Sequence, residues 1–161
     1  RTSCFHAEAV RSRLQKEGIS TEGITDWDLC SVVCGFQIAA VERLRRLCEQ
    51  SGAKIVLETS WKCMRNLDEM KRLFSLWRLD SYIVDMTDNE EMFFKEGAIQ
   101  RYLDAHPAVE NYVILDDISM RKAFPGHDVV TPDILDEESY RQALHILNHW
   151  TKELGHEHHL P

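Results

Sequence analysis

The sequence predicts an α/β domain with three layers, in which helices cover both faces of a mostly parallel sheet. Two apolar runs, residues 54–57 and 112–115, show no polar alternation, which is typical of strands buried on both faces. Amphipathic segments long enough for helices separate the apolar runs, and parallel strands need such helical crossovers. This alternation favours right-handed crossover units.

Helices and strands alternate along the chain from residue 36 onward. In residues 36–50 apolar side chains recur with helical spacing, and Ser51-Gly52 provides a glycine stop. Asn66, followed by Glu69, has the pattern of a helix N-cap with an acidic third position. The other expected elements are strands at 54–57, 82–84, 112–115 and 128–130, and helices at 97–105 and 136–154.

Three segments are predicted along the chain. Residues 1–35 fit the alternation least well, with a helix over 5–16 and a loop-rich stretch over 18–35, and we interpret them as an N-terminal insert or small cap. Residues 36–154 form the α/β core. Residues 155–161 are a polar tail in which His156, His158 and His159 either chelate a metal or, as we favour, fray into solvent.

Composition and charge exclude several classes of protein. The chain has 161 residues, 43% hydrophobic and 29% charged, which is the balance of one globular domain and not of a membrane-spanning, fibrous or disordered protein. The net charge of −8 opposes binding to a bare phosphate backbone unless a basic groove or a metal is present. Five cysteines with no CxxC pair indicate reduced thiols and a cytoplasmic location.

Candidate site residues follow the apolar strands, because ligands of such sheets bind beyond the carboxyl ends of the strands. Thr59 and Ser60 come soon after the strand at 54–57, and Asp116 and Asp117 follow the strand at 112–115. A carboxylate pair can hold Mg²⁺, hydroxyls can hold a phosphoryl oxygen, and Lys95 can neutralise its charge. Taken singly, the hydroxyls and Asp117 are also typical turn caps, and Lys95 a solvated lysine.

Together these stretches resemble the haloacid dehalogenase (HAD) superfamily. The segments GAKIVLETSWK, KEGAIQRYL, NYVILDD and QALHILNHW carry the resemblance, which is closest to the HAD domains of Swiss Army knife RNA repair proteins. It implies a Rossmannoid fold and a Mg²⁺-dependent phosphohydrolase. The resemblance implies that Thr59, or alternatively Ser60, binds the phosphoryl group. It also implies that Lys95 neutralises charge on that group and that Asp116 and Asp117 bind Mg²⁺.

One motif of that superfamily, the DxD sequence that supplies the attacking aspartate, has no clear counterpart here. By spacing the candidate is Asp26-Trp27-Asp28, but the preceding residues 22–25 make a poor buried strand. We therefore expect the nucleophile strand to lie upstream of Arg1 and the chain as given to show little phosphatase activity.

Two other functions remain open at this stage. One is a non-catalytic module that binds a phosphorylated ligand or another protein, and the other is a nucleic-acid end-processing domain, which the net charge disfavours. The expected ligand is accordingly a phosphorylated small molecule or a nucleic-acid end. Trp61, which follows the hydroxyl pair, either stacks on a base or packs against Leu67 and Met70, and we favour packing.

Overall fold

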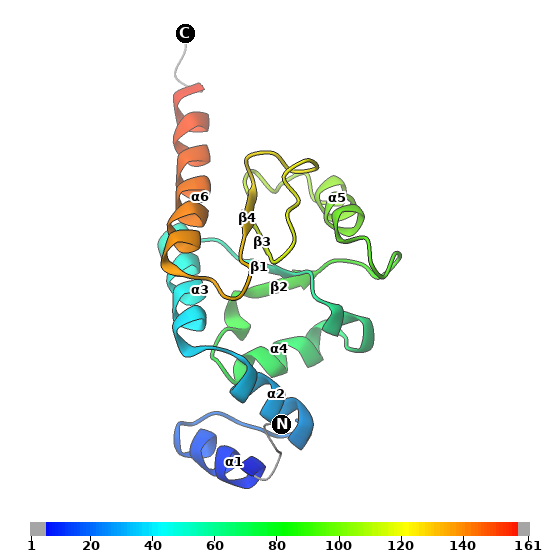
Figure 1. Cartoon of the computed structure of the whole chain (residues 1–161), viewed down its shortest axis with the longest axis vertical. Coiled ribbons are helices and arrows are strands. Elements are labelled where there is room, and N and C mark those ends of the chain that lie inside the picture. Colours follow the sequence, from blue (N-terminus) through cyan, green and yellow to red (C-terminus); the bar gives the residue numbers. More distant parts are fainter. Residues whose placement is uncertain (1–5, 158–161) are drawn as a thin grey trace.

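The structure, a computed structural model, describes residues 6–157 and the side chains of residues 6–149. Helices alternate with short strands along most of the chain (Figure 1). In chain order the elements are α1 (Ala7–Lys16), α2 (Asp26–Gly35), α3 (Ile38–Ser51), β1 (Ile55–Leu57), the 3-10 helix η2 (Ser60–Met64), α4 (Leu67–Ser75), the 3-10 helix η3 (Asp80–Tyr82), β2 (Ile83–Met86), α5 (Lys95–Ala105), β3 (Ile114–Asp116), β4 (Asp128–Val130) and α6 (Glu137–Glu157).

Local capping chemistry sets the ends of two helices as the sequence predicts. Gly52 ends α3 in the left-handed conformation at φ 73°, and its N–H donates to the Cys48 carbonyl over 2.9 Å. At the start of α4 the Asn66 side chain accepts a 2.9 Å hydrogen bond from the Glu69 N–H. α3 therefore ends directly before Gly52, and α4 begins directly after Asn66.

The strands form two small parallel sheets where one sheet was predicted. β1 pairs with β2, and β3 pairs with β4, each in parallel register. Within residues 6–157 no strand joins the two pairs, so the expectation of one continuous sheet is wrong for this part of the chain. The parallel direction of each pair is confirmed.

Residues 26–35 form a helix, and the prediction of a loop-rich stretch through residue 35 is wrong there. Thr25 caps α2 by accepting a 3.2 Å hydrogen bond from the Asp28 N–H. Asp26 and Asp28 lie in the first turn, where the helix dipole favours negative charge. The Asp-Trp-Asp sequence is thus a helix start and does not follow a strand.

Apolar side chains gather in separate clusters around the two sheets. The cluster at β1 and β2 includes the fully buried Leu29 and Met70, which joins α2 and α4 in one core. A second cluster packs α3 and α6 against β3 and β4 and includes the fully buried Ala143, and a third contains Phe124 together with residues of α5. Each fully buried leucine or methionine contributes about 1.5–3 kcal/mol.

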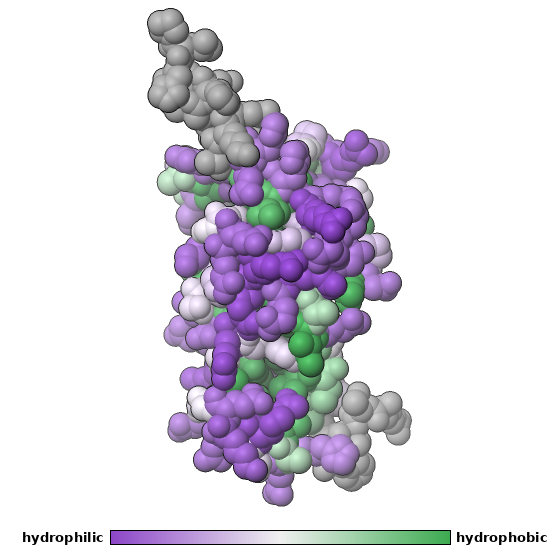
Figure 2. All heavy atoms as spheres, turned by 90° about the vertical axis from the view of Figure 1, so that its left-hand side faces the viewer, coloured by the Kyte–Doolittle hydropathy of each residue, from purple (hydrophilic) through white to green (hydrophobic). Residues whose placement is uncertain are grey.

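α3 and α6 lie side by side along one flank of the molecule (Figure 1). Arg43 and Arg46 of α3 both reach Glu137 at the start of α6, over 3.3 and 3.0 Å. The outer face of this flank is mainly hydrophilic (Figure 2). α6 extends to Glu157, past the predicted end at residue 154, while the predicted tail from residue 158 onward lies outside the described residues.

Two features concern the location of the protein. Among residues 6–157, no helix combines the length and the apolar character needed to cross a membrane. Cys34, Cys48 and Cys63 are free thiols, and Cys4 lies outside the described residues. A cytoplasmic location stays a prediction from the sequence.

Candidate functional site

Lys95 and Asp116 meet at the carboxyl end of β3. Lys95 is the first residue of α5, and Asp116 is the last residue of β3. The Lys95 Nζ lies 2.7 Å from Asp116 Oδ2, with 8% of the Asp116 side chain exposed. Two residues that are 21 positions apart in the sequence thus form an ion pair where the strand-end rule expects a site.

The surroundings of Asp116 keep its side chain ionised. Burial alone raises the pKa of this carboxyl, but hydrogen bonds from Lys95 and from the Ile118 N–H outweigh that effect and leave the pKa below its ordinary value. The Ile118 N–H donates to Asp116 Oδ1 over 3.0 Å. At neutral pH the β3 terminus therefore presents a fixed negative charge beside a cation.

Asp117 lies next to this pair and is exposed to solvent. Asp116 and Asp117 offer carboxylate oxygens, the donor type that Mg²⁺ prefers, and Mg²⁺ commonly binds proteins through one or two carboxylates and completes its shell with water and substrate phosphate. The part of the chain that the structure describes contains no group of three or more acidic, histidine or cysteine side chains arranged for a metal. The pair fits Mg²⁺ as a partial ligand set, which implies weak binding by the chain alone.

Thr59 and Ser60 lie beyond the end of β1. Thr59 is the N-cap of η2, and its Oγ1 accepts a 3.4 Å hydrogen bond from the Trp61 N–H. Ser60 is exposed at the start of the same turn. Within the described residues no hydrogen bond joins either hydroxyl to Lys95, Asp116 or Asp117. The structure thus joins the lysine to the aspartate and leaves the hydroxyl pair outside that contact.

A polar network at the ends of β1 and β2 was not singled out by the sequence. Lys62 is a lysine with only 5% of its surface exposed, and its Nζ lies 2.5 Å from Glu58 Oε2. The same ammonium donates to the Thr87 hydroxyl and, over 2.6 Å, to the Asp88 carbonyl. The Thr87 hydroxyl in turn donates to Glu58. All three donors of Lys62 are satisfied, and the network ties η2 to both strand ends.

Arg101 extends this polar region onto α5. Its Nε and one terminal nitrogen each lie 2.8 Å from an oxygen of Asp88, which is the bidentate geometry of a strong arginine–carboxylate pair. The Arg101 hydrogen bonds, followed by one from the Glu90 N–H, lower the pKa of Asp88 from 3.8 to about 2. The signal in the sequence was the position of Thr87 and Asp88 shortly after the strand predicted at 82–84.

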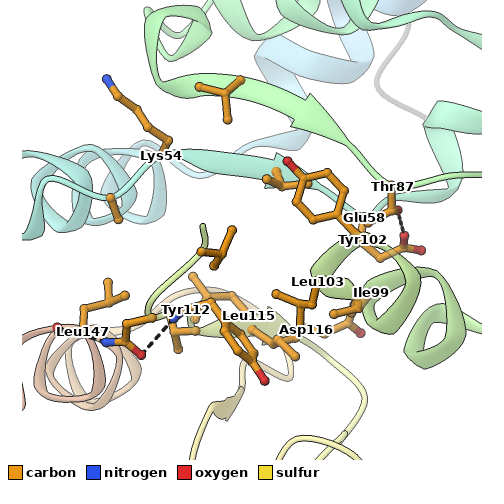
Figure 3. A pocket seen from close by; sticks show the side chains of 17 residues that line it. Lys54, Glu58, Thr87, Ile99, Tyr102, Leu103, Tyr112, Leu115, Asp116 and Leu147 are labelled. Carbon is orange, nitrogen blue, oxygen red and sulfur yellow. Dashed lines mark hydrogen bonds between the residues drawn. The ribbon is translucent and has the colours of Figure 1, made fainter. Parts of the chain in front are cut away.

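A cavity of about 440 Å³ separates β1 from β3. Its walls include Val56 of β1, Leu115 of β3 and Leu103 of α5 (Figure 3). Glu58 and Asp116 lie at one end of this cleft, and Lys54 and Tyr112 lie toward the other (Figure 3). The candidate ion pair and the polar network therefore share one rim of an otherwise mainly apolar cleft.

A comparison with family models supplies the remaining observation. The model described as the HAD domain in Swiss Army Knife RNA repair proteins matches residues 4–135, most of the chain. The chain belongs to this family. Comparison with curated proteins and with solved structures gives no match. The resemblance drawn from the sequence motifs is thus confirmed at the level of the family.

In this HAD domain both aspartates of the Asp-Trp-Asp sequence form ion pairs with arginines. Asp26 Oδ1 lies 2.7 Å from Arg11, and Asp28 Oδ1 lies 2.5 Å from Arg65. Both acids sit in the first turn of α2, which no strand immediately precedes among the described elements. Their position is that of charged groups linking α1, α2 and the turn after η2.

Trp61 packs inside the HAD domain as expected. Its side chain joins the cluster that contains Met70 and Leu67, and its ring stacks on Phe36 with centroids 6.1 Å apart. Phe36 also stacks on Trp77 at 6.4 Å. The half-buried indole is therefore part of an aromatic stack within the core, and the base-stacking alternative loses its support.

Proposed function

We propose that this HAD domain carries the phosphoryl- and Mg²⁺-binding half of a Mg²⁺-dependent phosphohydrolase site. The observation that carries the proposal is the 2.7 Å contact between Lys95 and an ionised Asp116 at the carboxyl end of a parallel strand, with Asp117 exposed beside it. Membership of the HAD family supports the same assignment. The expected ligand is a phosphoryl group, on a small molecule or at a nucleic-acid end.

Each residue has a distinct task in this proposal. Asp116 and Asp117 hold Mg²⁺, which when bound supplies positive charge to the phosphoryl oxygens. Lys95 keeps Asp116 ionised and offers its ammonium to the charge that develops on the transferred group. Thr59, beyond the end of β1, donates a hydrogen bond from its hydroxyl group to a phosphoryl oxygen, and Ser60 is the alternative donor.

In this proposal the described residues do not supply the nucleophile that attacks phosphorus. Asp26 and Asp28 of α2 are the candidates by sequence, and each forms an ion pair with an arginine of another segment. Electrostatic groups stabilise a transition state, but covalent catalysis also requires a nucleophile placed in line with the leaving group. We therefore expect binding of phosphate with little or no turnover.

The test combines binding and turnover measurements on the same protein. We expect calorimetry to detect Mg²⁺-dependent binding of inorganic phosphate by the wild type and by the control K122M, which removes an exposed lysine, and to detect none in K95M. Hydrolysis of p-nitrophenyl phosphate should stay at background in all three. Equal phosphate binding by K95M would overturn the proposal. Hydrolysis at an enzymatic rate that D26N abolishes would assign the nucleophile to α2 instead.

The source of the phosphoryl group is distinguished by parallel arms. A 3′-phosphorylated oligonucleotide and a phosphorylated sugar can each compete with inorganic phosphate in the same titration. The net charge of −8 predicts that the small molecule competes better, because the negative protein surface repels the additional phosphates of the oligonucleotide. A protein that binds none of these phosphates at any Mg²⁺ concentration fits the protein-interaction alternative.

A further inference from the structure

A second cleft lies beside α1 and shares no lining residue with the cleft between β1 and β3. Its volume is about 470 Å³, and its walls come from α1, α2, α3 and the turn that follows α4. In Figure 2 the lower part of the flank shows a hollow with hydrophobic atoms inside it and hydrophilic atoms around it. This site, the α1 cleft, therefore combines an apolar floor with a polar rim.

The floor of the α1 cleft consists of apolar side chains. Leu14 of α1 and Leu76 after α4 are buried, and Val33 of α2 and Trp77 are half-buried. The Trp77 indole N–H donates to the Val32 carbonyl over 3.0 Å, so its polar atom is already satisfied within the protein. A ligand that fills this cleft must therefore present an apolar surface to these side chains.

Three arginines line the rim, and two of them have no carboxylate partner. Arg45 Nη1 lies 2.5 Å from Glu42 Oε1, and these two charges offset each other. Arg13 and Arg78 are exposed and form no ion pair within residues 6–149, although most other arginines in this range form one. Guanidinium groups bind carboxylates through two parallel hydrogen bonds. The rim therefore offers unpaired positive charge and hydrogen-bond donors beside an apolar floor.

Arg78 occupies a backbone position that favours glycine. α4 ends in a Schellman turn, in which the Leu79 N–H donates to the Phe74 carbonyl over 3.1 Å. The turn holds Arg78 at φ 55°, where a side chain is strained and glycine is the usual residue. The Arg78 guanidinium donates over 2.9 Å to the Glu17 carbonyl at the end of α1, which uses only one of its N–H donors. Capping α1 thus leaves donors for a ligand, and an arginine at this strained position indicates a use for them.

We propose that the α1 cleft binds a small monocarboxylate with an apolar body, whose carboxylate accepts hydrogen bonds from Arg13 and Arg78 while its body packs on the floor at Trp77. The volume lies in the range of small-molecule pockets, roughly 300–1,000 Å³. Glu17 and Glu42 also line the rim, so the three arginines exceed the acids by one charge, which suits a monoanion better than a phosphate dianion. This ligand differs from the phosphoryl group of the proposed function, and so does its site.

Titration with 3-phenylpropionate, followed by amide NMR shifts, tests this site. We expect a Kd of roughly 1 mM, which is typical of a ligand of this size, with the shifts concentrated in α1 and residues 76–79. 3-Phenylpropanamide keeps the body without the charge, and acetate keeps the charge without the body; each should bind at least about fivefold more weakly. Absence of binding by 3-phenylpropionate, or equal binding by either control compound, overturns the proposal.

Two arginine substitutions, with a third as control, identify the groups that hold the carboxylate. R78G removes the guanidinium and gives the turn its favoured residue, so we expect a melting temperature within about 3 °C of wild type and at least about tenfold weaker binding. R13M should weaken binding at least about threefold. R121M removes an exposed arginine that lies outside the α1 cleft and should bind like the wild type. Undiminished binding by R78G or R13M, or an equal loss in R121M, overturns the assignment.

Glu17 provides a test of opposite sign. Its carboxylate lies on the same rim and repels an anion, so E17Q should strengthen binding of 3-phenylpropionate about twofold to fivefold. Unchanged or weaker binding by E17Q overturns the electrostatic assignment, because arginines that serve only to cap helix ends predict no gain. K95M should bind 3-phenylpropionate like the wild type. If K95M loses this binding, the ligand occupies the candidate phosphoryl site, and this inference fails without affecting the proposed function.

Discussion

Replacing Lys62 by methionine should destabilise the protein strongly, because a buried carboxylate loses its cation. Lys62 is 5% exposed, and Glu58 retains 16% exposure of its side chain. The change removes donors to Glu58, to the Thr87 hydroxyl and to the Asp88 carbonyl. The aliphatic part of the side chain is preserved, so the cost is electrostatic and not a cavity.

The magnitude follows from what remains behind. Removing one partner of a buried ion pair costs about 3–5 kcal/mol, because the other charge stays desolvated. Glu58 keeps some contact with water, which places K62M near the lower end, at about 3 kcal/mol. The double variant K62M/E58Q should recover a substantial part of this loss, since it leaves no uncompensated charge.

Urea unfolding at neutral pH measures these free energies of unfolding. K122M serves as the matched control, because Lys122 is exposed, and we expect it to change the free energy by less than about 0.5 kcal/mol. The reasoning is refuted if K62M is as stable as K122M. It is also refuted if K62M/E58Q is less stable than K62M, because the loss of stability in K62M then does not arise from the unpaired Glu58 carboxylate.

Three further outcomes are expected. In R101A the pKa of Asp88, about 2 in the wild type, should rise toward 3.8 in an NMR titration, and the variant should lose less stability than the wild type as pH falls from 3.8 to 2. D116N should weaken Mg²⁺ binding at least about tenfold by calorimetry, with the exposed D117N showing a smaller loss. F36A should cost about 3 kcal/mol and alter tryptophan fluorescence, since Phe36 stacks on two indoles; an unchanged spectrum contradicts that packing.

The features predicted correctly from the sequence depend on local chemistry or on a single topological rule. Gly52 ends α3 and Asn66 starts α4 because caps act within one turn of the helix. Lys95 and Asp116 were both assigned to one candidate site because ligands of such sheets bind beyond the carboxyl ends of the strands, whereas their direct ion pair was not predicted. Neither inference required knowledge of side-chain packing.

The features that were missed depend on contacts between distant segments. Lys62 is buried because it donates hydrogen bonds to Glu58 and to Thr87. These two residues lie 29 positions apart in the sequence and are also hydrogen-bonded to each other. The strands separate into two sheets with a cavity between β1 and β3, and no local sequence pattern predicts this separation. The helix at 26–35 is different, since the Thr25 cap and the acids of its first turn were visible in the sequence.

The split sheet has a consequence for the cooperativity of unfolding. The β1–β2 pair is buried in a cluster with Met70 and Ile83, whereas the β3–β4 pair is buried in clusters with Val129 and Phe124. No backbone hydrogen-bond ladder runs between the pairs within residues 6–157, so each cluster can open while the other stays folded. Amide exchange should therefore resolve two protection plateaus, one for each pair, and a ligand that bridges them should merge the plateaus into one.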